Sequence, residues 1–279
     1  MAFMRAIIRP AMNLDWPPPH FLVRWGRQLR AAWLSWWNVI LIGAEILLLA
    51  VLPSSYRKGL QRTAVLTHLL RATLPHINSF LVLSALVSLV LIRIVVATAS
   101  SYGLSQYALE VLVRTLVLEL IPLYAAMFVA LRYALPGAQE VRRHLAERLR
   151  EGCDVEHQQL LRSELLPRAL GATLSVMLLA GVSGVIALVL TYINVYGLSP
   201  WGLPEYTRGV GAVFTPAVSL IFALKTLFFS LAVAIVPFAA SAQRDAQGRF
   251  SRRSDISEFA RLLSVILIVE VISLVGNYY

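Results

Sequence analysis

Seven charged residues lie inside the apolar stretches of this sequence that are expected to cross a membrane, where a charged side chain is costly. These residues are Arg93, Glu110, Arg114, Glu119, Arg132, Lys225 and Glu270. On insertion scales each costs about 2.5 to 3.5 kcal/mol at the centre of a membrane helix, so such groups usually face a bundle interior or water and pair with one another. The chemistry open to them is therefore internal ion pairing or the lining of a polar path.

The position of each residue indicates which of these roles it can take. Glu110 and Arg114 are four residues apart and can pair on one face of a helix, for which we favour a structural role near the outer membrane surface. Arg132 lies close to the end of its stretch, where a long basic side chain can extend to the interface, and Arg93 can do the same.

Glu119 is the most informative of the seven because it lies deep in its stretch, shortly before Pro122. A proline inside a helix frees a backbone carbonyl and favours a kink. Lys225 is the expected partner of this carboxylate. Two interpretations stay open at this point: a buried ion pair that stabilises the bundle, or a cavity that water or lipid headgroups enter.

The composition excludes a water-soluble fold. Of the 279 residues 58% are hydrophobic and only 14% are charged, and the mean hydropathy is +0.70, whereas soluble proteins carry about 25% charged residues. We expect an all-α integral membrane protein with a basic N-terminus at 1–31 and one membrane domain at 32–279. The net charge of +10 is explained by loops that face anionic lipid, so no nucleic-acid partner is expected.

Six apolar stretches are long enough to be embedded in a bilayer, which needs about 20 residues per crossing. They lie at 32–52, 74–98, 108–135, 169–195, 210–240 and 262–279. Both flanks of the first stretch are basic, and Glu45 lies near its middle. Because basic flanks stay in the cytoplasm, we expect 32–52 to be an interfacial helix that is embedded without crossing, followed by five spanning helices.

The distribution of basic residues predicts the orientation of these helices. Four regions (1–31, 53–73, 136–168 and 241–261) hold 20 of the 25 Lys and Arg residues, and the positive-inside rule places all four in the cytoplasm. Residues 1–31 lack the pattern of a signal peptide, so we expect a cytoplasmic N-terminus and, after five crossings, a periplasmic C-terminus. Residues 136–168 are polar and predict a cytoplasmic helical hairpin or bent helix.

Common catalytic and nucleotide-binding motifs do not occur in the sequence. It contains no phosphate loop, zinc-binding H-E-x-x-H, G-x-S-x-G or G-x-G-x-x-G motif. Cys153 is the single cysteine, which excludes an intrachain disulfide, and the five histidines are scattered. We therefore expect no metal site and no cofactor on this chain; an active pump would need energy from elsewhere.

Several positions resemble the MlaE (YrbE) family of ABC-transporter permeases from about residue 60 onward. The family's second span typically reads L-R-E-L-G-P, then G-R and A-E-[IL]-G. At matching spacing this chain has Leu118 to Pro122, then Arg132, then Gln139 and Glu140. Pro167 and Arg168 match a family P-R pair, and Lys225 and Glu270 fall where members often carry Lys and Asp. The stretch at 32–52 is similar to the family's interfacial helix.

The departures from the family pattern are specific. Leu118 and Ile121 stand where the motif has arginine and glycine, and Leu131 and Ala134 replace small residues around Arg132. The stretch from Arg148 to Leu160 keeps neither the E-Q nor the G-x-D-P of the family's ATPase-contacting helix. The sequence is that of a divergent member.

The resemblance implies a permease subunit of an ABC-type phospholipid transporter in the bacterial inner membrane. Its implied partners are a separate ABC ATPase that uses ATP, an MCE-domain (MlaD-like) protein, a second permease copy and membrane lipids. Tyr102, Glu119, Lys225 and Glu270 would line the substrate path. Glu110, Arg114 and Arg132 would form an intramembrane charge network, and Glu140, Arg148 and Arg150 would couple to the ATPase.

Two alternatives belong to other functional classes. The degraded motif is compatible with a structural or assembly subunit that does not transport, and the presence of an ATPase gene beside this one would argue against that reading. A membrane enzyme with Glu119 and Glu270 as acid and base is the other alternative, disfavoured because no paired-carboxylate or metal motif accompanies them.

Overall fold

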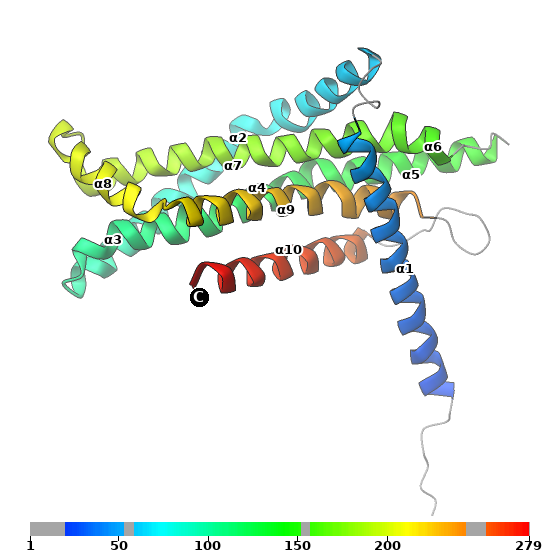
Figure 1. The fold of residues 1–279 in the computed structure, drawn as a ribbon, viewed down its shortest axis with the longest axis horizontal. Helices are drawn as coiled ribbons and strands as arrows, with labels where there is room; N and C mark the ends of the chain where they lie inside the picture. Colours follow the sequence, from blue (N-terminus) through cyan, green and yellow to red (C-terminus); the bar gives the residue numbers. More distant parts are fainter. Residues whose placement is uncertain (1–19, 53–58, 152–156, 244–254, 279) are drawn as a thin grey trace, which may run out of the picture.

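The computed structural model describes residues 20–52, 59–151, 157–243 and 255–278 (Figure 1). Every regular element in these ranges is a helix, and six helical segments are long and apolar enough to cross a membrane. The prediction of an all-α integral membrane protein is confirmed. Cys153 and most of the basic N-terminus lie outside the described residues.

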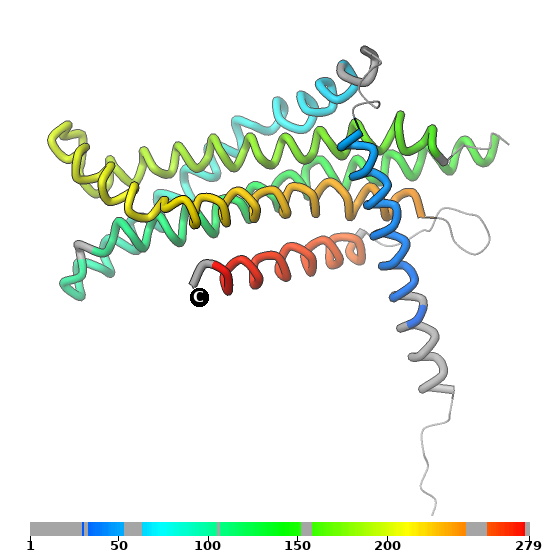
Figure 2. Tube along the Cα trace, in the orientation of Figure 1, coloured from blue at the N-terminus to red at the C-terminus, as the bar shows by residue number. Residues whose placement is uncertain are grey.

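Five helical segments alternate in direction along one bundle, as Figure 2 traces from α2 to α10. The first is α2 (Gly59–Ser101), and the last is α10 (Asp255–Tyr278). Between them the chain forms α3 (Ser105–Leu112), η2 (Val113–Leu120), α4 (Ile121–Val129), η3 (Ala130–Ala134), α5 (Leu135–Arg150), α6 (His157–Leu160), η4 (Leu161–Leu165), α7 (Leu166–Tyr196), η5 (Pro200–Gly202), α8 (Leu203–Val213) and α9 (Pro216–Ser241). The α2–α3 turn and α8 lie at one end, and the α5 and α9 termini lie toward the other (Figure 1).

The helix α1 (His20–Val51) lies across this bundle rather than along it, near the end where α5 and α9 terminate (Figure 1). It packs on α9 and α7. Gly43 permits this approach, because a Cβ atom there would overlap the Ile235 side chain of α9. Trp33 and Trp37 stay exposed on α1, as interfacial anchors do. The crosswise direction supports the predicted interfacial helix over a sixth crossing.

One predicted span is interrupted in the structure. We expected a continuous stretch at 210–240, but α8 ends at Val213 and α9 begins at Pro216. The Thr215 hydroxyl caps α9 by accepting a hydrogen bond from the backbone N–H of Val218 at 3.3 Å. Pro216 then occupies the first helical position, where its missing N–H costs nothing. Residues 210–213 therefore belong to the separate helix α8.

Three wide π-helical turns (η2, η3 and η4) each end two residues before a proline: Pro122, Pro136 or Pro167. A proline ring clashes with the carbonyl four residues earlier and leaves it without a donor. In all three places the N–H just before the proline bonds five residues back instead, as Ile121 does to Leu116. Each of these wide turns thus lies just before a proline, and wide turns in proteins often lie at functional sites.

The helix α7 forms the centre of the bundle, with α2, α4 and α9 packed around it. Its buried face is rich in small residues, including Gly171, Ala172, Ser175 and Ala180. A Cβ atom at Gly171 would lie 3.0 Å from the backbone of His68, so this glycine sets the close approach of α2. Small interfacial residues allow membrane helices to pack closely, which fixes the spans that carry the charged residues.

Candidate functional site

The ammonium of Lys225 on α9 lies between two carboxylates from different spans. It donates a hydrogen bond to Glu119 Oε2 of η2 and lies 2.8 Å from Glu270 Oε2 of α10. We call Glu119, Lys225 and Glu270 the triad. The expected pairing of Glu119 with Lys225 is confirmed, and Glu270 is a second partner of the same lysine.

The triad is nearly enclosed by protein. The Lys225 side chain is 2% exposed, and those of Glu119 and Glu270 are 11% and 15% exposed. The Lys225 ammonium also lies 5.6 Å from the ring centroid of Phe229, one turn further along α9, which adds a cation–π contact. Since three helices each contribute one charged group, the triad ties η2, α9 and α10 together in the apolar interior.

The composition of the triad defines what it can do chemically. Two carboxylates share one ammonium, so the fully ionised set carries one excess negative charge. In a low-dielectric interior this excess is costly unless it is compensated. The lysine keeps one partner if either carboxylate is removed, but both carboxylates lose their common partner if the lysine is removed. Loss of Lys225 is therefore the most disruptive single change at this site.

The other predicted path residue, Tyr102, lies apart from the triad within this chain. It lies in the turn between α2 and α3, and its side chain is exposed. The 15 helical residues from Ser105 to Glu119 correspond to roughly four turns of helix, which places Tyr102 toward the bundle end. A path that includes all four residues would thus run along much of one span.

The charged residues of the second span do not form one network. Arg114 Nε donates to Glu110 Oε1 at 3.1 Å, as their spacing predicts, and half of the Glu110 side chain is exposed. Arg132 is exposed on η3 and makes no ion pair within the described ranges. It is therefore separate from Glu110 and Arg114, which suits a side chain that extends to the interface.

The predicted helical hairpin at 136–168 is present, with α5 as one arm and α6 with η4 as the other. Glu140 is an exposed residue of α5 whose carboxylate reaches the base of α7. Arg168 Nη1 donates to Glu140 Oε2 at 3.0 Å, and Arg168 Nη2 donates to Glu164 Oε2 at 3.2 Å. We call these three residues the Arg168 cluster. It joins α5, η4 and α7 where the hairpin meets the bundle.

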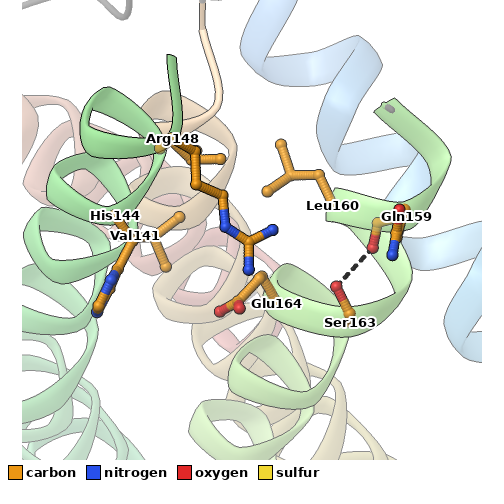
Figure 3. A pocket seen from close by; sticks show the side chains of 8 residues that line it. Val141, His144, Arg148, Gln159, Leu160, Ser163 and Glu164 are labelled. Carbon is orange, nitrogen blue, oxygen red and sulfur yellow. Dashed lines mark hydrogen bonds between the residues drawn. The ribbon is translucent and has the colours of Figure 1, made fainter. Parts of the chain in front are cut away.

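A small cavity of about 20 Å³ lies between the two hairpin arms (Figure 3). Val141, Leu145 and Leu160 form its apolar part, and the Arg148 side chain extends across it toward Glu164. Ser163 turns back to donate a hydrogen bond to the backbone oxygen of Gln159 at 2.7 Å. Arg148 and Arg150 are both exposed on α5, so their charges are available to a partner.

Two buried contacts that bring helix ends together were not foreseen from the sequence. Arg142 of α5 donates a hydrogen bond to Glu258 of α10, whose side chain is 2% exposed. Arg261 of α10 donates to the Ser35 hydroxyl of α1 at 2.9 Å, and that hydroxyl donates to Gln243. Both join residues more than 100 positions apart, so no local spacing signals them. By contrast, the Glu164–Arg168 pair could be detected from the sequence, because its members are four residues apart on one helical segment.

Comparison with known proteins identifies the family. A profile of the family described as Permease MlaE matches residues 65–274, a range that holds the triad and the hairpin and includes most of each of the five alternating spans. Among curated proteins none gives a significant match to the chain. Because the match extends over most of the sequence, this chain belongs to the MlaE permease family and is an ABC-type permease subunit, a multi-pass membrane protein.

Proposed function

We propose that this permease subunit moves phospholipid, or a similar amphiphile, between the bacterial inner membrane and an outer-facing MCE-domain protein. The observation that carries the proposal is the family match over residues 65–274. The sequence has no phosphate loop, so a separate ABC ATPase subunit would hydrolyse ATP. The N-terminus would lie in the cytoplasm and the C-terminus in the periplasm.

In this proposal two permease copies form the lipid path between them, and the triad lies beside that path. The exposure of its members supports this arrangement, because the two carboxylates keep a small exposed fraction while the lysine is almost fully buried. Glu119 and Glu270 would therefore present the polar groups, with Lys225 holding both in position. Tyr102 would act at the outer end of the same path.

The cytoplasmic hairpin would contact the ATPase. Arg148 and Arg150 are exposed on the arm α5 and are not held in ion pairs in the described structure. Glu140 keeps an exposed side chain but is also paired with Arg168. We therefore assign Arg148 and Arg150 to the contact itself, and Glu140 to the connection between the hairpin and α7.

The test is reconstitution of the complex in vesicles. The chain is co-expressed with an ABC ATPase and an MCE-domain protein from the same genome, purified, and assayed for ATP-dependent transfer of labelled phospholipid. Transfer that needs this chain and intact Walker residues in the ATPase is the expected result. A purified complex that lacks either partner, or that binds both and moves no lipid, would contradict the proposal.

A second candidate is a non-transporting subunit in a heterodimer with an active permease. It is favoured by Leu118 and Ile121 in place of motif residues, and by the absence of the usual ATPase-contacting sequence from 148–160. The same reconstitution distinguishes the two: a transporting complex with this chain as its sole permease excludes the second candidate. A complex active only with another permease present supports it.

A further inference from the structure

The Lys225 ammonium does not serve the two carboxyl groups of the triad equally. It donates a hydrogen bond to Glu119. Glu270 Oε2 lies 2.8 Å from the same nitrogen, but this buried oxygen accepts no hydrogen bond within the described structure. A buried carboxylate oxygen without a hydrogen bond is costly, whereas a neutral carboxyl group in the same place is much less so. The surroundings of Glu270 therefore favour a neutral side chain.

The two carboxyl groups are also close to each other. The side chains of Glu119 and Glu270 lie within hydrogen-bond reach, although they come from η2 and α10. Two ionised carboxylates at such a separation repel each other, and neither has a hydrogen to donate. When such a pair shares one proton, the protonated member donates to the other, as in aspartic proteases. The contact between these two acids therefore calls for one proton.

The charges around Glu270 leave one negative charge to be balanced. The other two members of the triad are the charged groups that act on it. The helix α10 packs on α9 and α5, and the α5 side chain that reaches α10, Arg142, is paired with Glu258. That pair lies about 18 Å from Glu270 along the helix. On η2, Arg114 is held by Glu110 at 3.1 Å. One ammonium thus serves two enclosed acids, and one proton would make the set neutral.

We propose that Glu119 and Glu270 share one proton at neutral pH, so that the triad is a proton-binding site inside the bundle and is neutral as a whole. The proton belongs to the pair and not to either residue alone. It is taken from water when η2, α9 and α10 pack together, and it returns to water when the carboxyl groups become solvated. This binding needs neither a partner subunit nor lipid transport, so its test is separate from that of the proposed function.

The test is infrared spectroscopy of the full chain, purified at neutral pH in a detergent that has no ester groups. A protonated carboxyl group has a C=O stretching band apart from the bands of carboxylates, and this band shifts in heavy water. We expect the band of one protonated carboxyl group per chain in the unaltered protein. Glu119→Gln and Glu270→Gln should each lose the whole band, because either change leaves one carboxylate beside one ammonium, which needs no proton.

The matched control is Glu140→Gln in the Arg168 cluster, which has the same composition but exposed acids. This variant should keep the band, and so should the unaltered protein when sodium replaces choline in the buffer. The unaltered protein alone can overturn the proposal, since the absence of the band would show that both acids are ionised. A band that survives Glu119→Gln would place the proton outside the pair or on Glu270 alone. A band present in choline and lost in sodium would show that a metal cation balances the charge.

Discussion

The triad and the Arg168 cluster have the same composition in two different surroundings. Each consists of two glutamates around one basic side chain, and each joins three helical elements. Their acids differ in exposure: the side chains of Glu140 and Glu164 are 56% and 37% exposed, against 11% and 15% for Glu119 and Glu270. The excess negative charge is therefore solvated at the hairpin and enclosed in the bundle.

This difference determines what each cluster costs and what it can do. Exposed ion pairs contribute about 0 to 1 kcal/mol because water competes for both partners. Breaking a buried pair costs about 3 to 5 kcal/mol, since it leaves a charge without compensation. The Arg168 cluster can thus rearrange when a partner docks on the hairpin, whereas the triad keeps the three spans in one arrangement or must change as a unit.

Replacement of Lys225 by methionine is expected to have the largest effect. It removes the common partner of two enclosed carboxylates, so the free energy of unfolding should fall by about 3 to 5 kcal/mol. Thermal melting in detergent measures this. Glu119→Gln should be milder, because Glu270 remains beside the ammonium at 2.8 Å.

The triple variant Glu119→Gln, Lys225→Met, Glu270→Gln is the control for this result. It removes all three charges, so it should recover much of the stability lost in Lys225→Met. A Lys225→Met variant that melts like the unaltered protein would remove the distinction between the two clusters.

Replacement of Arg168 by alanine should have a smaller effect of the same kind. The arginine side chain is 10% exposed, but its two glutamates reach water and stay solvated after its loss. We expect a loss of about 1 to 3 kcal/mol in the same melting assay. Arg168→Lys keeps the charge and should lose less. A loss equal to that of Lys225→Met would show that exposure of the acids does not matter.

Charge reversal of Arg148 and Arg150 should leave stability unchanged and weaken the bound ATPase. Rim charges mainly affect association, and two reversals should weaken it by about tenfold. Titration of the purified ATPase onto the permease in nanodiscs measures this affinity. Arg208→Glu at the other end of the bundle is the matched control. Equal binding by both variants would place the contact elsewhere.

Replacement of Glu110 by glutamine should have the smallest effect. Its pair with Arg114 follows the four-residue helical spacing and is half exposed, and such pairs contribute about 0.3 to 0.5 kcal/mol. The expected change in melting temperature is therefore close to the error of the measurement. A large destabilisation would mean that lipid encloses this pair as effectively as protein encloses the triad.

Features set by local chemistry could be predicted from the sequence. Apolar length located the spans, and the cost of an embedded carboxylate made Lys225 the expected partner of Glu119. Features set by packing could not. The break at 214–215 follows from Pro216 and Thr215, but both lie inside a stretch whose hydropathy is continuous. The Arg142–Glu258 pair depends on where α10 docks, which neither residue signals locally.

The pairing of Glu119 with Lys225 could be expected from the sequence, but a second carboxylate beside the same ammonium could not. Glu270 lies beside the same ammonium, whereas its place in the sequence predicts only that it shares the path. Membrane helices pack by shape, and the rotation of α10 about its axis cannot be read from a uniformly apolar sequence.

The wide turns before Pro122 and Pro136 have a consequence for the angular phase of the long helical segment 105–150. A π turn closes on a bond five residues back where an α turn closes on four, and one residue corresponds to about 100° of rotation in an α-helix. A single periodicity therefore cannot describe this segment. At Pro122 and Pro136, where a proline carries such a turn, the side chains beyond it take a new azimuth although the number of residues in the span is unchanged.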